Sequence, residues 1–112
     1  MSLSDRQHEF ALDVSFLIAK IYQDGMKCSL GEAFRTPEQA AIYAKDGRGI
    51  ADSLHCSRLA IDLNLFTADG EYLSDSKDYE KFGIYWESLH AANRWGGRFK
   101  RADGNHFERQ DK

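Results

Sequence analysis

The feature that most constrains the fold is an alternating run from Leu59 to Phe66 that carries a carboxylate in its middle. Leucine or isoleucine occupies every second position, and Asp62 and Asn64 lie between them. A β-strand sends successive side chains to opposite faces, so the run predicts a strand with one apolar face in a core and Asp62 on the other. Asp is rare in strands, and its desolvation there requires a partner. A cation is the partner that best offsets that cost.

Two histidines and a second aspartate are placed to complete a metal site around Asp62. His55 lies seven residues upstream, on the segment that leads into the strand, and His106 lies near the other end of the chain. Catalytic zinc sites use three protein ligands of this kind and leave the fourth position to water. His55, Asp62 and His106 form such a set. Asp103, separated from His106 by a flexible glycine-asparagine pair, is predicted to act as general base on that water.

Taken singly, these residues also have structural explanations. His106 is equally suited to be a hydrogen-bonded histidine between a turn and a strand. Cys56 adjoins His55, and a thiolate is a good zinc ligand, but adjacent residues of an extended segment point to opposite sides. We therefore expect Cys56 to be a small, partly buried thiol. The constellation of residues, and no single member of it, favours a metal site.

Several short segments follow one another in an order that matches a known family. They are Phe34-Arg35-Thr36-Pro37-Glu38-Gln39, the pattern Ser-x-His-x-x-x-x-Ala-x-Asp at Ser53, His55, Ala60 and Asp62, the triplet Trp95-Gly96-Gly97, and the acid-x-x-His pattern at Asp103 and His106. In these segments the chain resembles the zinc peptidases of the D-alanyl-D-alanine carboxypeptidase and dipeptidase group, peptidase family M15. Within that group it is most similar to short phage endolysins that cut between L-alanine and D-glutamate in peptidoglycan.

The resemblance implies a role for each matched residue. It implies a zinc ion held by His55, Asp62 and His106, general-base catalysis by Asp103, and a hydrogen bond from Ser53 to the substrate. The fold it implies is a small α+β domain, in which an antiparallel sheet carries the zinc ligands and helices pack on one face. The substrate it implies is the stem peptide of peptidoglycan.

Arg35 matches the arginine with which the family binds substrate, so the resemblance implies a binding role, and we expect a catalytic role in addition. It immediately precedes a predicted helix that begins at Thr36, where backbone N–H groups and the helix dipole add to its positive charge. We expect it to bind a substrate carboxylate or carbonyl oxygen and to help stabilise the oxyanion. From the residues alone, the alternative is a surface arginine paired with Glu32 or Glu38.

The chain departs from the family pattern at two positions. The family commonly has a glycine three residues after the first histidine, where this chain has Arg58. A cationic side chain there would narrow the cleft, alter substrate preference or turn outward. Much of the wider group uses glutamate as general base, whereas Asp103 is shorter, as is often the case in the phage branch. That difference favours the endolysin type over the dipeptidases.

Apolar spacing predicts the helices and the order of elements. The first helix is expected to begin at a cap provided by Ser4 or Asp5 and to end at Gly25. A shorter one is expected between Thr36 and Gly47, with Thr as cap and Pro at the first helical position.

The second half of the chain predicts a hairpin arm at 71–73, a helix over about 78–92, and a loop at 93–99. Glycine and aromatic residues in that loop suit a cleft wall, although a Trp more often packs in a core. Residues 1–112 are expected to form one domain.

Composition excludes several classes of protein. The chain has 42% hydrophobic and 29% charged residues and a net charge of -3, so nucleic acid is not an expected partner. It has no apolar run of membrane-spanning length, so no membrane insertion is expected. We also expect the protein to be a monomer. The N-terminal segment lacks the plan of a secretory signal. We therefore expect synthesis in the cytoplasm and release to the cell wall by other means, such as a phage holin.

The function predicted from these observations is zinc-dependent hydrolysis of the L-alanyl-D-glutamate bond in the stem peptide of peptidoglycan. Two alternatives stay open. One is a D-alanyl-D-alanine carboxypeptidase or dipeptidase. The other is a non-catalytic zinc module that binds cell-wall peptide, with Arg58 obstructing the chemistry.

Overall fold

The computed structural model describes residues 1–50 and 52–110. In these ranges the α-helices and strands are α1 (Leu3–Gln23), β1 (Lys27–Leu30), α2 (Pro37–Lys45), β2 (Ala60–Phe66), β3 (Tyr72–Leu73), α3 (Glu80–Leu89), β4 (Asn93–Trp95) and β5 (His106–Arg109). Short 3-10 helices are η1 (Leu54–Ser57), η2 (Ser76–Tyr79) and η3 (Gly96–Arg98). None of the described helices combines the length and apolarity that crossing a membrane requires.

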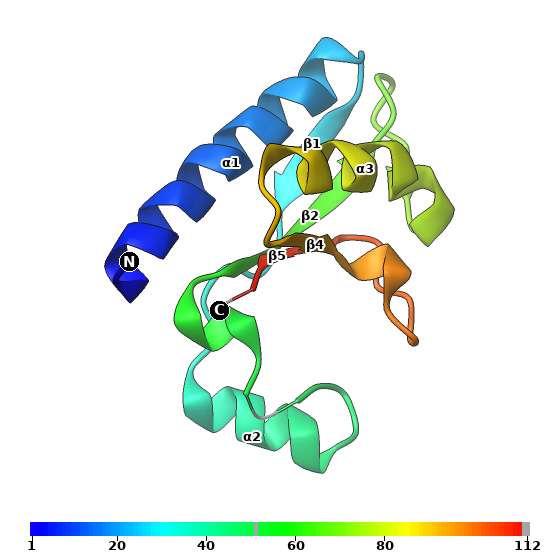
Figure 1. Cartoon of the computed structure of the whole chain (residues 1–112). Coiled ribbons are helices and arrows are strands. Elements are labelled where there is room, and N and C mark those ends of the chain that lie inside the picture. Colours follow the sequence, from blue (N-terminus) through cyan, green and yellow to red (C-terminus); the bar gives the residue numbers. More distant parts are fainter. Residues whose placement is uncertain (51, 111–112) are drawn as a thin grey trace.

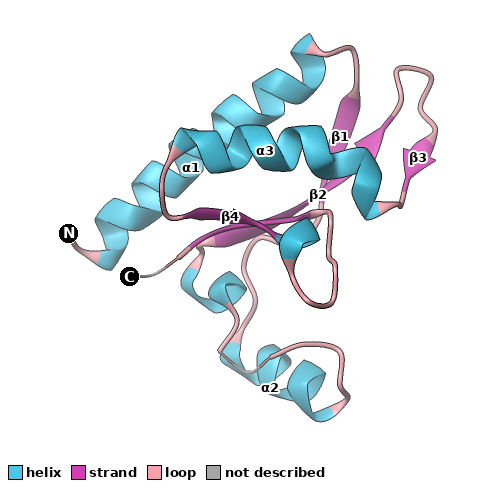
Figure 2. Ribbon diagram, turned by 45° about the vertical axis from the view of Figure 1, so that its right-hand side comes forward, coloured by secondary structure: helices cyan, strands magenta, loops and turns pink. Residues whose placement is uncertain are grey.

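The strands form an antiparallel sheet in which β2 is central. The order is β1-β2-β5-β4, and β3 pairs with the end of β2. Helices α1 and α3 cover one face of this sheet, whereas α2 lies apart from them beyond the opposite face (Figures 1 and 2). The predicted α+β fold, with an antiparallel sheet and helices packed on one face, is confirmed.

The core lies between the sheet and the helices α1 and α3. The alternation predicted for β2 is confirmed, because Leu59, Leu63 and Leu65 are fully buried while Asp62 and Asn64 are partly exposed on the other face. Burying each of these leucines stabilises the fold by roughly 1.5–3 kcal/mol. The remaining large members of this core are Phe10, Leu17, Ile21, Ile61, Tyr79, Phe82, Trp86, Trp95 and Phe107.

The first helix begins earlier than its apolar pattern predicted. Ser2, and neither Ser4 nor Asp5, is the N-cap: the Ser2 side chain accepts from the backbone N–H of Asp5, whose carboxylate accepts from Ser2 at 3.2 Å. This reciprocal pair is a capping box with Asp at the third helical position. The predicted end before Gly25 is confirmed, and Gly25 has a φ of +82°. The predicted cap of α2, Thr36, is also confirmed.

The second half of the chain differs more from its prediction. Helix α3 is shorter than the expected 78–92, because η2 precedes it and the chain becomes extended at His90. The expected loop at 93–99 contains β4 and η3. Asn93 pairs with Arg109 across β4 and β5. A three-residue strand has no periodicity of its own and forms here through that pairing.

Trp95 packs inside the fold, which is the second of the two roles that the sequence left open for this ring. It is 4% exposed, and its Nε1 donates to the carbonyl of Gly104 at 2.7 Å. A Cβ on Gly83 or Gly97 would come within 2.1 Å of the indole ring, so both positions exclude a side chain. From the same segment, Phe99 reaches the cleft instead.

A buried cation ties β5 to α1. Arg109 is 2% exposed and donates to Asp13 at 2.7 Å, to Glu9 at 2.9 Å and to the side-chain oxygen of Asn93 at 2.7 Å. Asn93 also donates to Asp13 at 3.1 Å. A buried charge of this kind is tolerated only while its partners remain.

Replacing Asp13 by alanine should lower the free energy of unfolding by roughly 3–5 kcal/mol, because it leaves a buried guanidinium without its most buried carboxylate. Urea denaturation followed by circular dichroism measures this loss. Glu9→Ala is the matched control: its side chain is 42% exposed, so it should cost less than about 1 kcal/mol. Equal losses in the two variants would contradict this account of the cluster.

Candidate metal centre

The pairing of β2 with β5 sets Asp62 directly opposite His106. Opposed residues of antiparallel strands point to the same face, with their Cβ atoms about 4.5–5.5 Å apart. His55 comes from η1, the 3-10 turn that leads into β2. The three predicted ligands therefore converge, two from strands and one from the adjacent turn.

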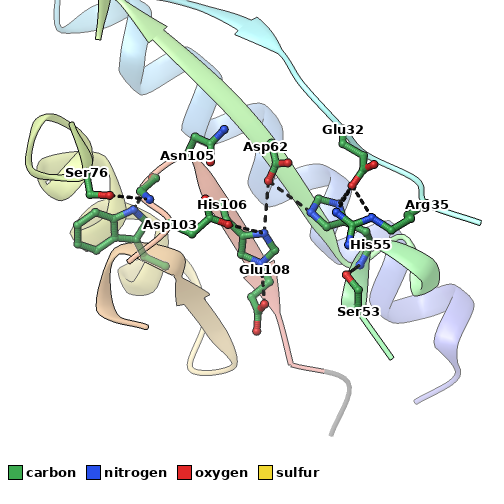
Figure 3. Close-up of polar contacts among 12 residues, drawn as sticks. Glu32, Arg35, Ser53, His55, Asp62, Ser76, Asp103, Asn105, His106 and Glu108 are labelled. Carbon is green, nitrogen blue, oxygen red and sulfur yellow. Dashed lines mark hydrogen bonds and ion pairs between the residues drawn. The ribbon is translucent and has the colours of Figure 1, made fainter. Parts of the chain in front are cut away.

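One ligand atom from each of these three residues lies within 4.8 Å of the others (Figure 3). The Oδ1 atom of Asp62 is 3.3 Å from Nε2 of His55 and 3.3 Å from Nδ1 of His106. This buried oxygen nevertheless has no hydrogen bond of acceptable geometry. A buried carboxylate oxygen placed between two imidazole nitrogens needs a shared partner, and a cation satisfies all three.

The outward nitrogens of both histidines have acceptors. Nδ1 of His55 is 3.3 Å from the carbonyl of Ala33, and Nε2 of His106 is 2.7 Å from Oε1 of Glu108. We assign the ring protons to these outward nitrogens from their partners. In the neutral rings, the inward nitrogens, Nε2 of His55 and Nδ1 of His106, then keep their lone pairs for a metal.

Asp103 enters the site from the loop between η3 and β5. Its backbone N–H donates to the carbonyl of Gly96 at 2.9 Å, and its carbonyl accepts from the backbone N–H of His106 at 3.1 Å. Its Oδ2 lies 4.0 Å from Nδ1 of His106, and its side chain is 55% exposed. The carboxylate thus stands on the open side of the ligand group, where a general base must lie.

The glycine-asparagine pair after Asp103 is packed, so the prediction that it is flexible is wrong. Gly104 is buried, its N–H donates to the hydroxyl of Ser76 at 2.9 Å, and a Cβ there would lie 2.5 Å from the Cα of Ser76. The side-chain amide of Asn105 donates to the side-chain oxygen of Asn64 on β2 at 3.2 Å. A rigid turn therefore holds Asp103 against the site.

Arg35 lies at the cleft and is paired with an acid. Its side chain is 13% exposed, and its Nε donates to Oε1 of Glu32 at 2.7 Å while Nη2 contacts the same oxygen. The guanidinium also lies over the ring of Tyr43, 5.0 Å from its centroid. The structure thus shows the ion pair with Glu32 that the sequence left open as the alternative to substrate binding. It also places Arg35 in the lining of the cleft. Nη1 is not part of this ion pair.

Ser53 and Cys56 flank His55 in η1. Ser53 caps the turn, since its Oγ accepts the backbone N–H of His55 at 3.2 Å. The substrate hydrogen bond of Ser53 stays a prediction. Cys56 places its Sγ 4.0 Å from the carbonyl of Thr36. The thiol therefore points toward the start of α2, and it does not belong to the group of ligand atoms formed by the described residues.

Arg58 turns away from the ligand group. Its guanidinium lies over the ring of Phe34, 4.0 Å from the centroid, and it lines a separate apolar pocket beside α1. Its φ is +57°, a left-handed conformation that favours glycine. This left-handed backbone explains why the family commonly has a glycine at this position. The Arg58 side chain does not narrow the cleft.

The ligand group lies in a cleft of 760 Å³ formed by the sheet, the segment after α2 and the loop before β5. The Nη1 atom of Arg101 donates to the carbonyl of Gly47 at 3.3 Å and joins those two segments. Four arginines line the cleft, namely Arg35, Arg48, Arg94 and Arg101, together with the acids Asp52, Asp62, Asp103 and Glu108. A cleft of this size and polarity accommodates a short peptide.

Asp62 and His106 stabilise each other's charge. Burial disfavours the ionised form of Asp62, but its contacts with His106 and His55 outweigh this and lower the pKa of Asp62 to about 2. Burial likewise disfavours protonation of His106, yet the carboxylates of Asp62 and Glu108 raise the pKa of His106 to about 9. A metal bound here competes with that proton.

Comparison with protein families gives a match over residues 46–109 to a family model of the M15 peptidases, described as D-alanyl-D-alanine carboxypeptidase. The match spans more than half of the 112 residues and includes the three candidate ligands and Asp103. Comparison with curated proteins gives no significant match.

The fold is shared with several solved structures, among them two peptidases. The Serratia marcescens L-Ala D-Glu endopeptidase ChiX has a TM-score of 0.65 and 21% identity, over 76% of this chain and 68% of that one. A mutant of the vancomycin resistance D,D-pentapeptidase VanY from a VanB-type cassette, solved with Zn(II), has a TM-score of 0.60 and 16% identity, over 89% of this chain and 70% of that one.

The match to the family model places the protein among the metallopeptidases, and the convergent group of potential ligands fits that class. Within that class, the chain belongs to the M15 peptidase family. The family predicted from the sequence is therefore confirmed.

Glu108 is the residue of the site that the sequence analysis missed. The available signal was its position two residues after His106, because residues i and i+2 of a strand share a face. That signal depends on knowing that the four residues of β5 are a strand, and their pairing with β2 and β4 decides this.

Protein stripped of metal by a chelator should lose stability as the pH rises from about 6.5 to about 9. The folded-state pKa of His106, about 9, exceeds its ordinary value of 6.5, so its contribution is complete below 6.5 and disappears as the pH passes through the folded-state pKa. We expect a loss on the order of 2 kcal/mol, measured by urea denaturation across this range. His106→Gln should flatten the dependence, and an unchanged slope in that variant would refute the assignment.

Proposed function

We propose that the protein is a zinc-dependent peptidoglycan peptidase that hydrolyses the L-alanyl-D-glutamate bond of the stem peptide, as phage endolysins of this type do. One observation carries the proposal: His55, Asp62 and His106 converge at about hydrogen-bond distance, with Asp103 beside them on the open side. Membership of the M15 family and the fold shared with ChiX, an L-Ala D-Glu endopeptidase, support the choice of reaction.

Zinc is the metal that this donor set favours. Two imidazole nitrogens and one carboxylate oxygen, with a side open to a cleft, are the ligands of catalytic zinc sites. When bound, zinc supplies an activated water and polarises the carbonyl of the substrate. His55, Asp62 and His106 would hold it, with their outward partners fixing the rings.

Asp103 is the proposed proton carrier. Burial raises the pKa of its carboxyl, and the neighbouring charge of Asp62 adds to the effect, although His106, His55 and Arg101 oppose it. A raised pKa makes the carboxylate a better proton acceptor. Asp103 takes a proton from the attacking water and passes it to the leaving amine.

Arg35 is the proposed anchor for the substrate. Glu32 engages its Nε and Nη2, so the Nη1 donors are the ones proposed to bind a carboxylate or carbonyl oxygen of the peptide. The ion pair with Glu32 and the contact with Tyr43 hold the guanidinium in one orientation. Ser53 is proposed to add a hydrogen bond through its hydroxyl hydrogen.

A D-alanyl-D-alanine carboxypeptidase is the second candidate. The description of the matching family favours it, as does the fold shared with VanY, a D,D-pentapeptidase. The two reactions use the same chemistry on different bonds, so the products distinguish them. Release of D-alanine marks the carboxypeptidase, and new N-terminal D-glutamate marks the endopeptidase.

We also propose where and in what form the protein acts. Its proposed substrate lies in the cell wall, and we propose that it acts there as a monomer after synthesis in the cytoplasm and holin-type release.

Asp103→Asn should retain about one zinc per chain but lose at least about 100-fold in turnover, because it keeps the shape of the side chain and removes the base. Mass spectrometry of soluble products from purified peptidoglycan measures turnover and identifies the bond cleaved. His106→Ala is the comparison variant and should lose the metal as well as activity. Full turnover by Asp103→Asn would exclude Asp103 as the base, and wild-type protein that binds zinc without releasing products would favour a non-catalytic module.

Arg58→Gly tests whether the arginine obstructs the reaction. We expect zinc affinity and turnover to stay unchanged, because the guanidinium packs on Phe34 outside the cleft. Stability should change by no more than about 1 kcal/mol, since relief of the left-handed backbone is offset by the lost ring contact and by the freedom of glycine in the unfolded chain. A clear gain in turnover would show instead that Arg58 blocks the site.

A further inference from the structure

Glu108 is a buried carboxylate that is hydrogen-bonded to a candidate metal ligand. It lies on β5 two residues after His106, and the two side chains share a face of the strand (Figure 3). Its Oε1 is 2.7 Å from Nε2 of His106, and the residue is 8% exposed. Its other oxygen, Oε2, lies 3.6 Å from Nε of Arg94 on β4, whose side chain is 48% exposed.

We propose that Glu108 is a positioning residue that selects the tautomer and ring orientation with which His106 binds the metal. The inference rests on the zinc site of the proposed function. By accepting the Nε2 proton of the neutral ring, Glu108 leaves Nδ1, which lies 3.3 Å from Oδ1 of Asp62, able to bind the metal through its lone pair. A carboxylate in this position also makes the imidazole a stronger ligand.

The neighbouring acids make this selection necessary. Asp62 Oδ1 at 3.3 Å and Asp103 Oδ2 at 4.0 Å both lie near Nδ1 of the histidine, and either would attract a proton to that nitrogen. A proton on Nδ1 occupies the lone pair that the metal requires. The rings of His55 and Phe99, with centroids 5.0 and 5.6 Å away, restrict the position of the imidazole but do not distinguish its two nitrogens. Glu108 makes that distinction.

Core packing does not account for a carboxylate at this position. A buried acid is costly unless its partners offset the lost hydration. The strand is held through its main chain, since the carbonyl of Glu108 accepts the indole N–H of Trp86 at 3.0 Å, and the opposite face of β5 packs through Phe107. Changing the Glu108 side chain should therefore affect the metal site more than the fold.

The test compares zinc affinities of the wild type, Glu108→Gln, Glu108→Ala and a control, Glu9→Gln, by competition with a chromophoric chelator. We expect affinity to fall about 10-fold in Glu108→Gln, which keeps an acceptor but loses the charge, and up to about 100-fold in Glu108→Ala. Glu9→Gln removes a carboxylate that bonds the next residue of β5, Arg109, from outside the site. It should leave affinity unchanged.

Nuclear magnetic resonance supplies a readout that a merely structural role would not change. Long-range proton-nitrogen correlation in the zinc-loaded protein should show opposite tautomers: His55 coordinated through Nε2, and His106 through Nδ1 with a slowly exchanging proton on Nε2. In Glu108→Ala that proton should exchange faster, while the His55 signals stay as in the wild type, since the partner of His55 is the carbonyl of Ala33.

The outcomes separate this inference from the proposed function. A wild type that binds no zinc would refute the function, and the zinc site with it. A wild type that binds zinc, accompanied by folded Glu108 variants of equal affinity and unchanged His106 signals, would refute the positioning role alone. Circular dichroism and melting temperature establish folding, and if Glu108→Ala does not fold, the near-isosteric Glu108→Gln decides the matter.

Discussion

The antiparallel pairing of β2 with β5 is the constraint on which the rest of the structure depends. It sets Asp62 opposite His106 on the cleft face and, one residue earlier, Ile61 opposite Phe107 on the core face. A slip of one residue would turn every side chain of β5 to the other face, so that an imidazole would enter the core and a phenyl ring the cleft. Hydrophobic burial on one face thus determines the geometry of the candidate metal ligands on the other.

Close packing of neighbouring backbone segments supports Asp62 and Asp103 from behind. Gly31 lies against Asp62, and a Cβ there would stand 3.0 Å from the Cβ of Asp62, so the chain after β1 runs directly beside the ligand. The carbonyl oxygen of Asp103 lies only 2.2 Å from the position that a Cβ on residue 96 would occupy, so only glycine fits at Gly96. Asp103 is therefore held by a packed backbone, although its carboxylate is partly exposed. Such support is what a catalytic group on a loop needs to keep its position.

The acidic residues around His106 lie on two sides of its imidazole ring. Asp62 and Asp103 face the inward nitrogen, whereas Glu108 faces the outward one. Carboxylates on both sides of a buried imidazole favour its protonation, which explains the raised pKa of His106. A cation bound in the proposed site would take the place of that proton and interact with the same carboxylates, so the arrangement of charges that stabilises the site also suits a metal.

Local pattern alone determined several features of this protein. The alternation around Asp62 predicts the central strand, the apolar spacing predicts α1, and Thr36 and Pro37 predict the start of α2, because each depends on neighbours within one turn or one pleat. The types and order of His55, Asp62, Asp103 and His106 indicate the chemistry. Only the tertiary structure decided that β4 is a strand, that Trp95 is buried, that Arg35 is paired with Glu32, and that Glu108 bonds the second histidine. These features depend on which segments meet and in what register, and hydrophobic burial across the whole chain sets both.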